Sequence, residues 1–252
     1  MSQTRSDGRG AAALRKISIE TGLQANPEGS VLIRAGNTHV LVSASVEEGV
    51  KDFLAGSGRG WVTAEYAMHP RANPRRQRRE GRDGKLGGRT QEIQRLIGRG
   101  LRAAVNLKAL GERTIHIDCD VLTADGGTRT ASVTGGYVAL LMALDSLRRR
   151  GLIGGGLVRE PVAAVSVGLL GGVALLDLCY EEDRDAQVDL NLVATRSGQI
   201  IEVQGTAEGE PMSRSEHDAL LDRALEGVRE LTELQAQALE RAEVDVSRLL
   251  AG

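Results

Sequence analysis

A chain of 252 residues with 41% hydrophobic and 26% charged residues is typical of one large globular domain or two fused half-domains. Aromatic residues make up only 2%, which argues against nucleic-acid recognition by stacked aromatic platforms, and the net charge of -2 excludes a protein that is basic all over. No apolar run reaches the roughly 20 residues of a membrane span, and the N-terminus has no signal-peptide core. We therefore expect a cytoplasmic protein with no membrane partner.

The first half of the chain has the pattern of strands followed by helices. Residues 1–13 are polar and glycine-rich, and we expect them to be flexible unless a partner orders them. Residues 30–34 and 39–45 predict a hairpin, and residues 61–66 a third strand. Apolar spacing then predicts a helix from Thr90 to Gly111, a half-buried strand over 114–122, and a second helix that stops at 148–151.

The second half repeats this order. Residues 162–170 and 173–180 predict one hairpin, residues 189–195 and 199–206 another, and residues 213–241 a long helix. Strands followed by helices thus occur twice, which predicts a pseudo-duplicated α/β domain with mixed or antiparallel sheets and halves at about 14–150 and 161–241. We expect residues 242–252 to be flexible.

The segment from His69 to Arg89 carries eight basic residues against two acidic ones. Its two prolines and four glycines exclude a helix or a central strand. A charge run is often only a solvated surface. The preference for arginine over lysine nevertheless favours contact with a phosphate backbone, because a guanidinium group presents a forked set of donors.

Glycines and an arginine stand before two of the predicted helices, in Gly87-Gly88-Arg89-Thr90 and in Gly126-Gly127-Thr128-Arg129-Thr130. A helix start offers unpaired N–H groups and a positive dipole end, and the arginine adds a charged donor, so each segment suits an anion such as phosphate. The alternative is an ordinary strand-to-helix turn capped by Thr130. Convergence of both segments on one phosphate is a hypothesis that the sequence cannot test.

Acidic residues gather between Asp177 and Asp189, where one predicted strand ends and the next begins. Closely placed carboxylates are costly to keep ionised without a cation, so Mg²⁺ or Mn²⁺ is a natural partner, although a solvated acidic turn is the simpler explanation on spacing alone. Together with the two glycine–arginine segments, these carboxylates suggest metal-assisted attack at phosphorus. We expect Cys119 and Cys179 to be reduced core thiols.

Nearly the whole chain, from about residue 5 to about residue 240, resembles the bacterial ribonuclease PH family. The resemblance lies in long motifs, among them GWVTAEY at 60–66, ADGGTRTAS at 124–132 and IEVQGTAEG at 201–209. Further matching segments cover residues 37–41, 47–50, 87–90, 92–97 and 118–122.

This resemblance implies a fold and an activity. The implied α/β (α+β) fold is like domain 2 of ribosomal protein S5, duplicated within a single domain over 1–252, with mixed sheets and packed helices. The implied enzyme is a phosphate-dependent 3′-to-5′ exoribonuclease, a tRNA nucleotidyltransferase. It would trim tRNA precursors, with rRNA a further substrate class, and release nucleoside diphosphates. The reverse reaction would add nucleotides to RNA 3′ ends. A cytoplasmic homohexamer, a trimer of dimers, is implied, and no DNA partner.

The resemblance also assigns residues. Inorganic phosphate, the co-substrate, would be held by Arg89, Gly127, Thr128 and Arg129. Asp183 and Asp189 would be the catalytic carboxylates beside Mg²⁺, with Mn²⁺ as a substitute, and which of them holds the metal or acts as general acid stays open. The RNA-contacting residues would be Arg71, Arg75, Arg76, Arg78, Arg79 and Arg82.

Two other functions use parts of the same pattern. A hydrolytic metal-dependent nuclease would use the acidic residues but leave the arginines beside the two helix starts without a purpose. A non-catalytic RNA-binding ring subunit would need only the arginine-rich segment, and the presence of both Arg89 and Arg129 with both aspartates argues against it.

Overall fold

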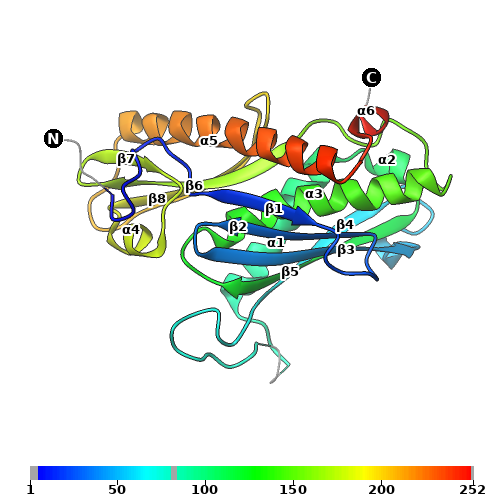
Figure 1. The fold of residues 1–252 in the computed structure, drawn as a ribbon, viewed down its shortest axis with the longest axis horizontal. Coiled ribbons are helices and arrows are strands. Elements are labelled where there is room, and N and C mark those ends of the chain that lie inside the picture. Colours follow the sequence, from blue (N-terminus) through cyan, green and yellow to red (C-terminus); the bar gives the residue numbers. More distant parts are fainter. Residues whose placement is uncertain (1–4, 81–83, 251–252) are drawn as a thin grey trace.

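The computed structural model of the protein describes residues 5–80 and 84–250. Two sheets lie side by side with helices between and over them (Figure 1). The first sheet has the strand order β1-β2-β3-β5-β4, and all of its pairs are antiparallel except the parallel pair β4–β5. Its strands are β1 (Ile17–Thr21), β2 (Gly29–Ala35), β3 (Thr38–Glu48), β4 (Trp61–Met68) and β5 (Arg113–Thr123).

The second sheet is wholly antiparallel, with the order β7-β6-β8-β9. Its strands are β6 (Val162–Leu170), β7 (Val173–Leu176), β8 (Val188–Thr195) and β9 (Ile200–Ala207). The predicted fold class is therefore confirmed: a mixed α/β fold in which each half supplies one sheet and at least one long helix.

Three long helices hold the sheets together. α1 (Gly88–Ala104) packs on β4, and α3 (Thr128–Arg149) lies between the two sheets in contact with β2, β3 and β6. α5 (Arg214–Arg241) covers the second sheet (Figure 1), where its Leu220, Ala224 and Val228 join the apolar cluster of β6 and β8. α3 is long and apolar enough to cross a membrane, but 89% of its most apolar window is buried in this core.

Most predicted elements are confirmed, and three differ. The helix expected to run to Gly111 ends at Ala104, because Val105 is extended and Asn106 caps the separate short helix α2 (Leu107–Leu110). β7 stops at Leu176, because Asp177 adopts a positive φ of 55°. Residues expected to form an acidic loop instead form the short helix α4 (Tyr180–Asp185), and β1 was not predicted.

Both chain ends are more ordered than the sequence suggested. Among residues 5–13, Arg5 is buried and donates two hydrogen bonds to Glu182. Near the C-terminus, α6 (Val246–Leu249) buries Leu249, whose carbonyl accepts hydrogen bonds from two backbone N–H groups at 2.8 Å. Residues 1–4 and 251–252, also expected to be flexible, lie outside the described part of the chain.

The two cysteines carry free thiols. Cys119 is buried in β5, and burial raises the pKa of its thiol, so it is an inert core residue, as predicted. Cys179 is half-buried at the start of α4 rather than in a strand.

Candidate active site

The glycine loop, residues 125–127, joins β5 to α3. Gly126 and Gly127 have positive φ values of 73° and 65°, which glycine adopts without steric cost. A Cβ atom on Gly126 would lie 2.7 Å from the Leu178 carbonyl oxygen, so the loop packs directly on the chain leading into α4. Gly127 is the N-cap residue of α3, so the alternative of a turn capped by Thr130 does not hold: the Thr130 hydroxyl donates to the Gly127 carbonyl at 2.9 Å from inside the helix.

The start of α3 carries free donors. The first backbone bond of the helix runs from Ala131 N to Gly127 O at 3.0 Å. Within the described ranges, the preceding N–H groups, those of residues 127–130, have no acceptor. Free N–H groups at a helix N-terminus, together with the positive dipole end of a helix of 22 residues, make an anion-binding site.

α1 begins in the same way. Its N-cap is also a glycine, Gly87, without a side-chain cap, and its first backbone bond runs from Gln91 N to Gly87 O at 3.1 Å. Arg89 and Arg129 are each the second residue of their helix. The sequence suggested that each arginine stands before its helix. In the structure, both arginines lie within the first helical turn.

Tyr66, on β4, contacts the start of α3. Its hydroxyl lies 2.8 Å from the Thr128 Oγ1 atom. Burial raises the pKa of the Tyr66 hydroxyl, while the hydrogen bond with Thr128 and the positive charges of Arg89 and Arg129 oppose that rise. The N-terminal parts of the two helices also contact each other directly, because Arg129 of α3 donates to Glu92 of α1. The two glycine–arginine segments therefore lie close together.

The second sheet contributes to the same place. Arg129 donates from Nη1 to the Gln204 Oε1 atom of β9 at 2.9 Å and to Glu92 of α1 at 3.4 Å. Only 16% of its side chain is exposed. These contacts hold the guanidinium group of Arg129 in one orientation. A fixed orientation is what a planar, forked donor needs to bind a ligand specifically.

The two predicted carboxylates face this region from the second half. Asp183 is exposed on α4, and Asp189 is half-buried at the start of β8. Burial raises the pKa of Asp189, the negative charge of Asp183 raises it further, and the positive charge of Arg129 lowers it. Asp189 lies two residues before Asn191 on β8, and Asn191 pairs with Gln204 of β9, the acceptor for Arg129. This strand pairing places Asp189 near the start of α3.

These carboxylates fit a hard divalent cation of the Mg²⁺ type. Such a cation keeps several waters and takes one or two protein carboxylates together with phosphate oxygens. In the described ranges no cluster of three or more His, Cys, Asp or Glu side chains is arranged to enclose a metal. Asp183 and Asp189 would supply the one or two protein carboxylates that such an ion takes.

The arginine-rich segment leaves the body of the protein below the first sheet (Figure 1). Of its predicted RNA-contacting residues, five are exposed, and Arg82 lies outside the described residues. The segment is tied to α1 by Thr90, whose hydroxyl donates to Glu80 at 2.5 Å. Arg71 and Arg75 line an open cleft of about 1290 Å³. The cleft reaches Asp125 of the glycine loop and Tyr180 of α4. The segment therefore adjoins the site.

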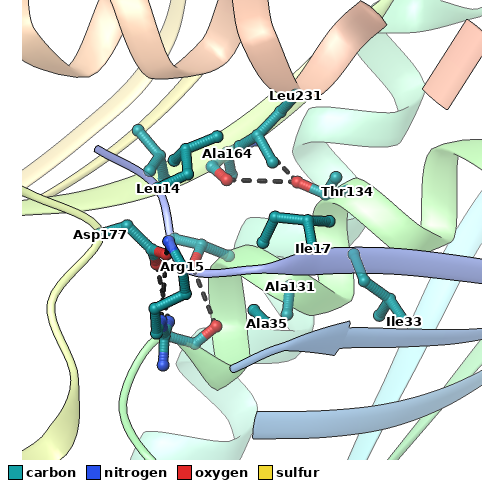
Figure 2. Close-up of a pocket in the computed structure, with 13 residues that line it drawn as sticks. Leu14, Arg15, Ile17, Ile33, Ala35, Ala131, Thr134, Ala164, Asp177 and Leu231 are labelled. Atoms are coloured by element: carbon teal, nitrogen blue, oxygen red, sulfur yellow. Dashed lines mark hydrogen bonds and ion pairs between the residues drawn. The ribbon is translucent and has the colours of Figure 1, made fainter. Parts of the chain in front are cut away.

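Sequence reasoning missed several residues of this region. Tyr66 and Gln204 lie within motifs that carry the family resemblance, but nothing local marks them as partners of Thr128 and Arg129. Nothing in the sequence marks Arg15 as part of the site, because an arginine after a polar N-terminal segment is normally a solvated charge. In the structure it faces Asp177 behind the glycine loop (Figure 2).

Comparison with known proteins identifies the family of this chain. The chain matches the models of the 3′ exoribonuclease family, domain 1 over residues 13–144 and domain 2 over residues 160–227. Fold and site thus define a 3′ exoribonuclease. Ribonuclease PH of Corynebacterium efficiens and that of Corynebacterium glutamicum are each 55% identical over 236 residues, covering 94% of this chain and 96% of the relative. The chain belongs to the bacterial ribonuclease PH family.

Solved structures show the same fold. An Archaeoglobus fulgidus exosome with RNA bound to its active site has a TM-score of 0.72 at 25% identity over 91% of both chains. Rice Rrp46 has a TM-score of 0.75 at 18% identity, covering 93% of this chain and 100% of the other.

Proposed function

We propose that this enzyme is a phosphate-dependent 3′-to-5′ exoribonuclease that trims the 3′ ends of tRNA precursors and releases nucleoside diphosphates. The contacts that join the two glycine–arginine helix starts to each other and to the strand of Asp189 carry the proposal. A hydrolytic nuclease needs no second anion site, whereas phosphorolysis must hold an attacking phosphate next to the phosphate under attack. Run in reverse, the same site adds nucleotides to RNA from nucleoside diphosphates. Ribosomal RNA precursors are a further proposed substrate class.

The attacking phosphate is held by the start of α3 and by two arginines. The N–H groups of Gly127, Thr128 and Arg129 supply donors, and the guanidinium groups of Arg89 and Arg129 supply positive charge. This charge offsets the repulsion between the attacking phosphate and the RNA backbone and orients the phosphate for in-line attack. The Tyr66–Thr128 hydrogen bond keeps the Thr128 hydroxyl fixed on the protein side of the site.

The carboxylates act on the scissile phosphate and on the leaving 3′-oxygen. Asp183 and Asp189 are the residues that would hold Mg²⁺, or Mn²⁺ in its place, and a bound ion supplies charge stabilisation at the scissile phosphate. Whichever of the two carboxylates does not hold the ion could instead act as a general acid that protonates the leaving 3′-oxygen.

The arginine-rich segment binds the body of the RNA. Arg71, Arg75, Arg76, Arg78 and Arg79 are exposed and contact phosphates of the substrate rather than bases, which gives salt-sensitive recognition by shape. That an exosome relative holds RNA at its active site supports an RNA strand in the equivalent position here. We further propose a cytoplasmic homohexamer, a trimer of dimers, on the strength of family membership.

One assay separates phosphorolysis from hydrolysis. A labelled tRNA with a short 3′ extension is incubated with Mg²⁺, with and without inorganic phosphate. Nucleoside diphosphates formed only with phosphate support the proposal, and monophosphates formed without phosphate contradict it. The absence of both products would indicate an RNA-binding subunit without activity.

The variant Arg129→Ala tests the phosphate site itself. We expect it to lower phosphorolysis by about 10²-fold or more, the loss typical of removing one preorganised charge-stabilising donor, while tRNA binding stays within about twofold of the unmodified protein. An equal loss of both properties in a folded variant would contradict the assigned role.

A further inference from the structure

Arg15 contacts the carbonyl oxygens of the glycine loop. Its Nη1 atom donates to the Asp125 carbonyl at 2.6 Å and, more weakly, to the Gly126 carbonyl at 3.4 Å. The Thr38 hydroxyl donates to the same Gly126 carbonyl at 2.6 Å. In a trans peptide the C=O and N–H groups point to opposite sides. Holding the Gly126 carbonyl therefore directs the Gly127 N–H away from Arg15, toward the open start of α3.

Arg15 is itself anchored by the second half of the chain. Its Nε and Nη2 atoms donate to the two carboxylate oxygens of Asp177 at 3.0 and 2.7 Å, and its backbone N–H donates to Asp177 at 2.8 Å (Figure 2). The two side chains are only 4% and 6% exposed. The Asp177 N–H donates to the Ser166 carbonyl of β6 at 2.7 Å, so the pair is fixed to the second sheet.

The surrounding backbone is shaped around this arginine. A Cβ atom on Gly127 would lie 2.7 Å from the Arg15 Nη2 atom, and one on Gly36 would lie 2.9 Å from its Cδ atom. Both glycines have positive φ, at 65° and 55°. Asp177, with a φ of 55°, is one of two residues other than glycine with positive φ among the described residues. Three backbone positions with positive φ thus surround the Arg15 side chain. This indicates that the local backbone conformation is specialised to hold Arg15 in place.

We infer that Arg15 is a positioning residue for the attacking phosphate. It does not touch the phosphate. It fixes the glycine loop of the first half to the Asp177 bend of the second half, three residues before α4, and so sets the direction of the loop N–H groups relative to Asp183. The inference rests on the proposed phosphate site at the start of α3.

Two variants test this role. Arg15→Lys keeps the charge, but an ammonium group lacks the fork that reaches Asp177 and the Asp125 carbonyl together. The double variant Arg15→Met/Asp177→Asn removes both buried charges, so that neither is left unpaired, and asparagine tolerates positive φ. For both we expect the KM for phosphate to rise about tenfold or more, with kcat at saturating phosphate and the KM for RNA within about threefold, the pattern of weakened ground-state binding.

Direct phosphate binding gives a second readout. Without RNA, inorganic phosphate should raise the Tm of the unmodified protein, and the increase should be smaller in both variants, because at a fixed concentration a ligand with a higher Kd stabilises the fold less. A merely structural role would lower Tm and the active fraction while the KM for phosphate stays unchanged.

A matched control lies at the other end of α3. Arg148 forms a two-donor contact with the buried Asp145, at 3.0 and 2.7 Å. It is about 30 Å along the helix from the glycine loop. Arg148→Lys and Arg148→Met/Asp145→Asn should lower stability in the same way as the Arg15 variants but leave the KM for phosphate unchanged.

The variant Arg129→Gln distinguishes a failure of the positioning role of Arg15 from a failure of the proposed phosphate site. If it raises the KM for phosphate while the folded Arg15 variants leave that KM within twofold of the unmodified protein, the positioning role of Arg15 is overturned and the phosphate site stands. If neither residue affects the KM for phosphate, the proposed site itself is wrong, and the inference falls with it.

Discussion

The Asp125 carboxylate accepts a hydrogen bond from the Tyr180 backbone N–H at 3.1 Å. The two residues belong to different halves of the chain, 55 positions apart. Asp125 opens the glycine loop that leads into α3, and Tyr180 is the first residue of α4, the helix that carries Asp183. One hydrogen bond therefore ties the proposed phosphate site to one of the proposed metal-binding carboxylates.

Removing this carboxylate should weaken the metal site. We expect Asp125→Ala to raise the Mg²⁺ concentration for half-maximal phosphorolysis by about tenfold, in the range seen when groups that orient metal ligands are removed. Asp125→Asn keeps an acceptor for the Tyr180 N–H and should retain most of the Mg²⁺ affinity. A Mg²⁺ titration of initial rates measures both. Equal Mg²⁺ dependence in the alanine variant and the unmodified protein would argue against the link.

The arginine-rich segment should control RNA affinity and not chemistry. We expect the variant with Arg75, Arg76, Arg78 and Arg79 changed to Ala to bind tRNA more weakly. The slope of log Kd against log salt concentration should fall by about 1 for each RNA phosphate that an arginine no longer neutralises. Phosphorolysis of a short single-stranded oligonucleotide should keep its kcat. The control changes four exposed arginines elsewhere, Arg149, Arg196, Arg214 and Arg248. An effect of similar size in this control would contradict a specific role.

Asp189 should destabilise the metal-free protein at neutral pH. Burial and the neighbouring Asp183 raise its pKa in the folded state above the ordinary value of 3.8. The folded state therefore binds this proton more tightly than the unfolded state does. The resulting stabilisation is full below the ordinary pKa and is lost as pH rises through the raised one.

It follows that Asp189→Asn should raise the Tm at pH 7 in the presence of a chelator, by about 2 °C or more. The gain should shrink as pH falls toward 4, and added Mg²⁺ should stabilise the unmodified protein more than the variant. Thermal unfolding across pH 4–8 measures these differences. A lower Tm for the variant at pH 7 would show that the ionised Asp189 carboxylate does not destabilise the folded state.

The Arg5–Glu182 ion pair should anchor the N-terminal segment to α4. Its side chains are 1% and 7% exposed, with donor–acceptor distances of 2.7 and 2.6 Å. We expect Arg5→Met to lower the free energy of unfolding by about 3 kcal/mol, because a buried carboxylate loses its closest partner. Arg5→Met/Glu182→Gln should recover much of that loss. Urea unfolding measures both variants, and a loss below about 1 kcal/mol for the single variant would mean that Arg9, 3.7 Å from Glu182, replaces Arg5 as the partner.

Local sequence patterns determined most of the elements. The hairpin of β2 and β3, the core helix α3 and the long helix α5 follow from apolar spacing and turn glycines, all within a few residues of the elements they define. The long motifs around Arg89 and Arg129 likewise indicated an anion site, and the structure shows that both helix starts are built alike.

Only the tertiary structure decided how these parts meet. Arg15 and Asp177 are separated by 162 positions, and Arg5 and Glu182 by 177, so no local pattern could show that polar N-terminal arginines become buried partners. The same holds for the contact of Tyr66 with Thr128 and for the bend at Asp177 that ends β7 early. The sequence by itself determined the elements and the chemistry of each segment, because these depend on neighbouring residues. Their convergence depends on packing between the two sheets, which only the folded chain defines.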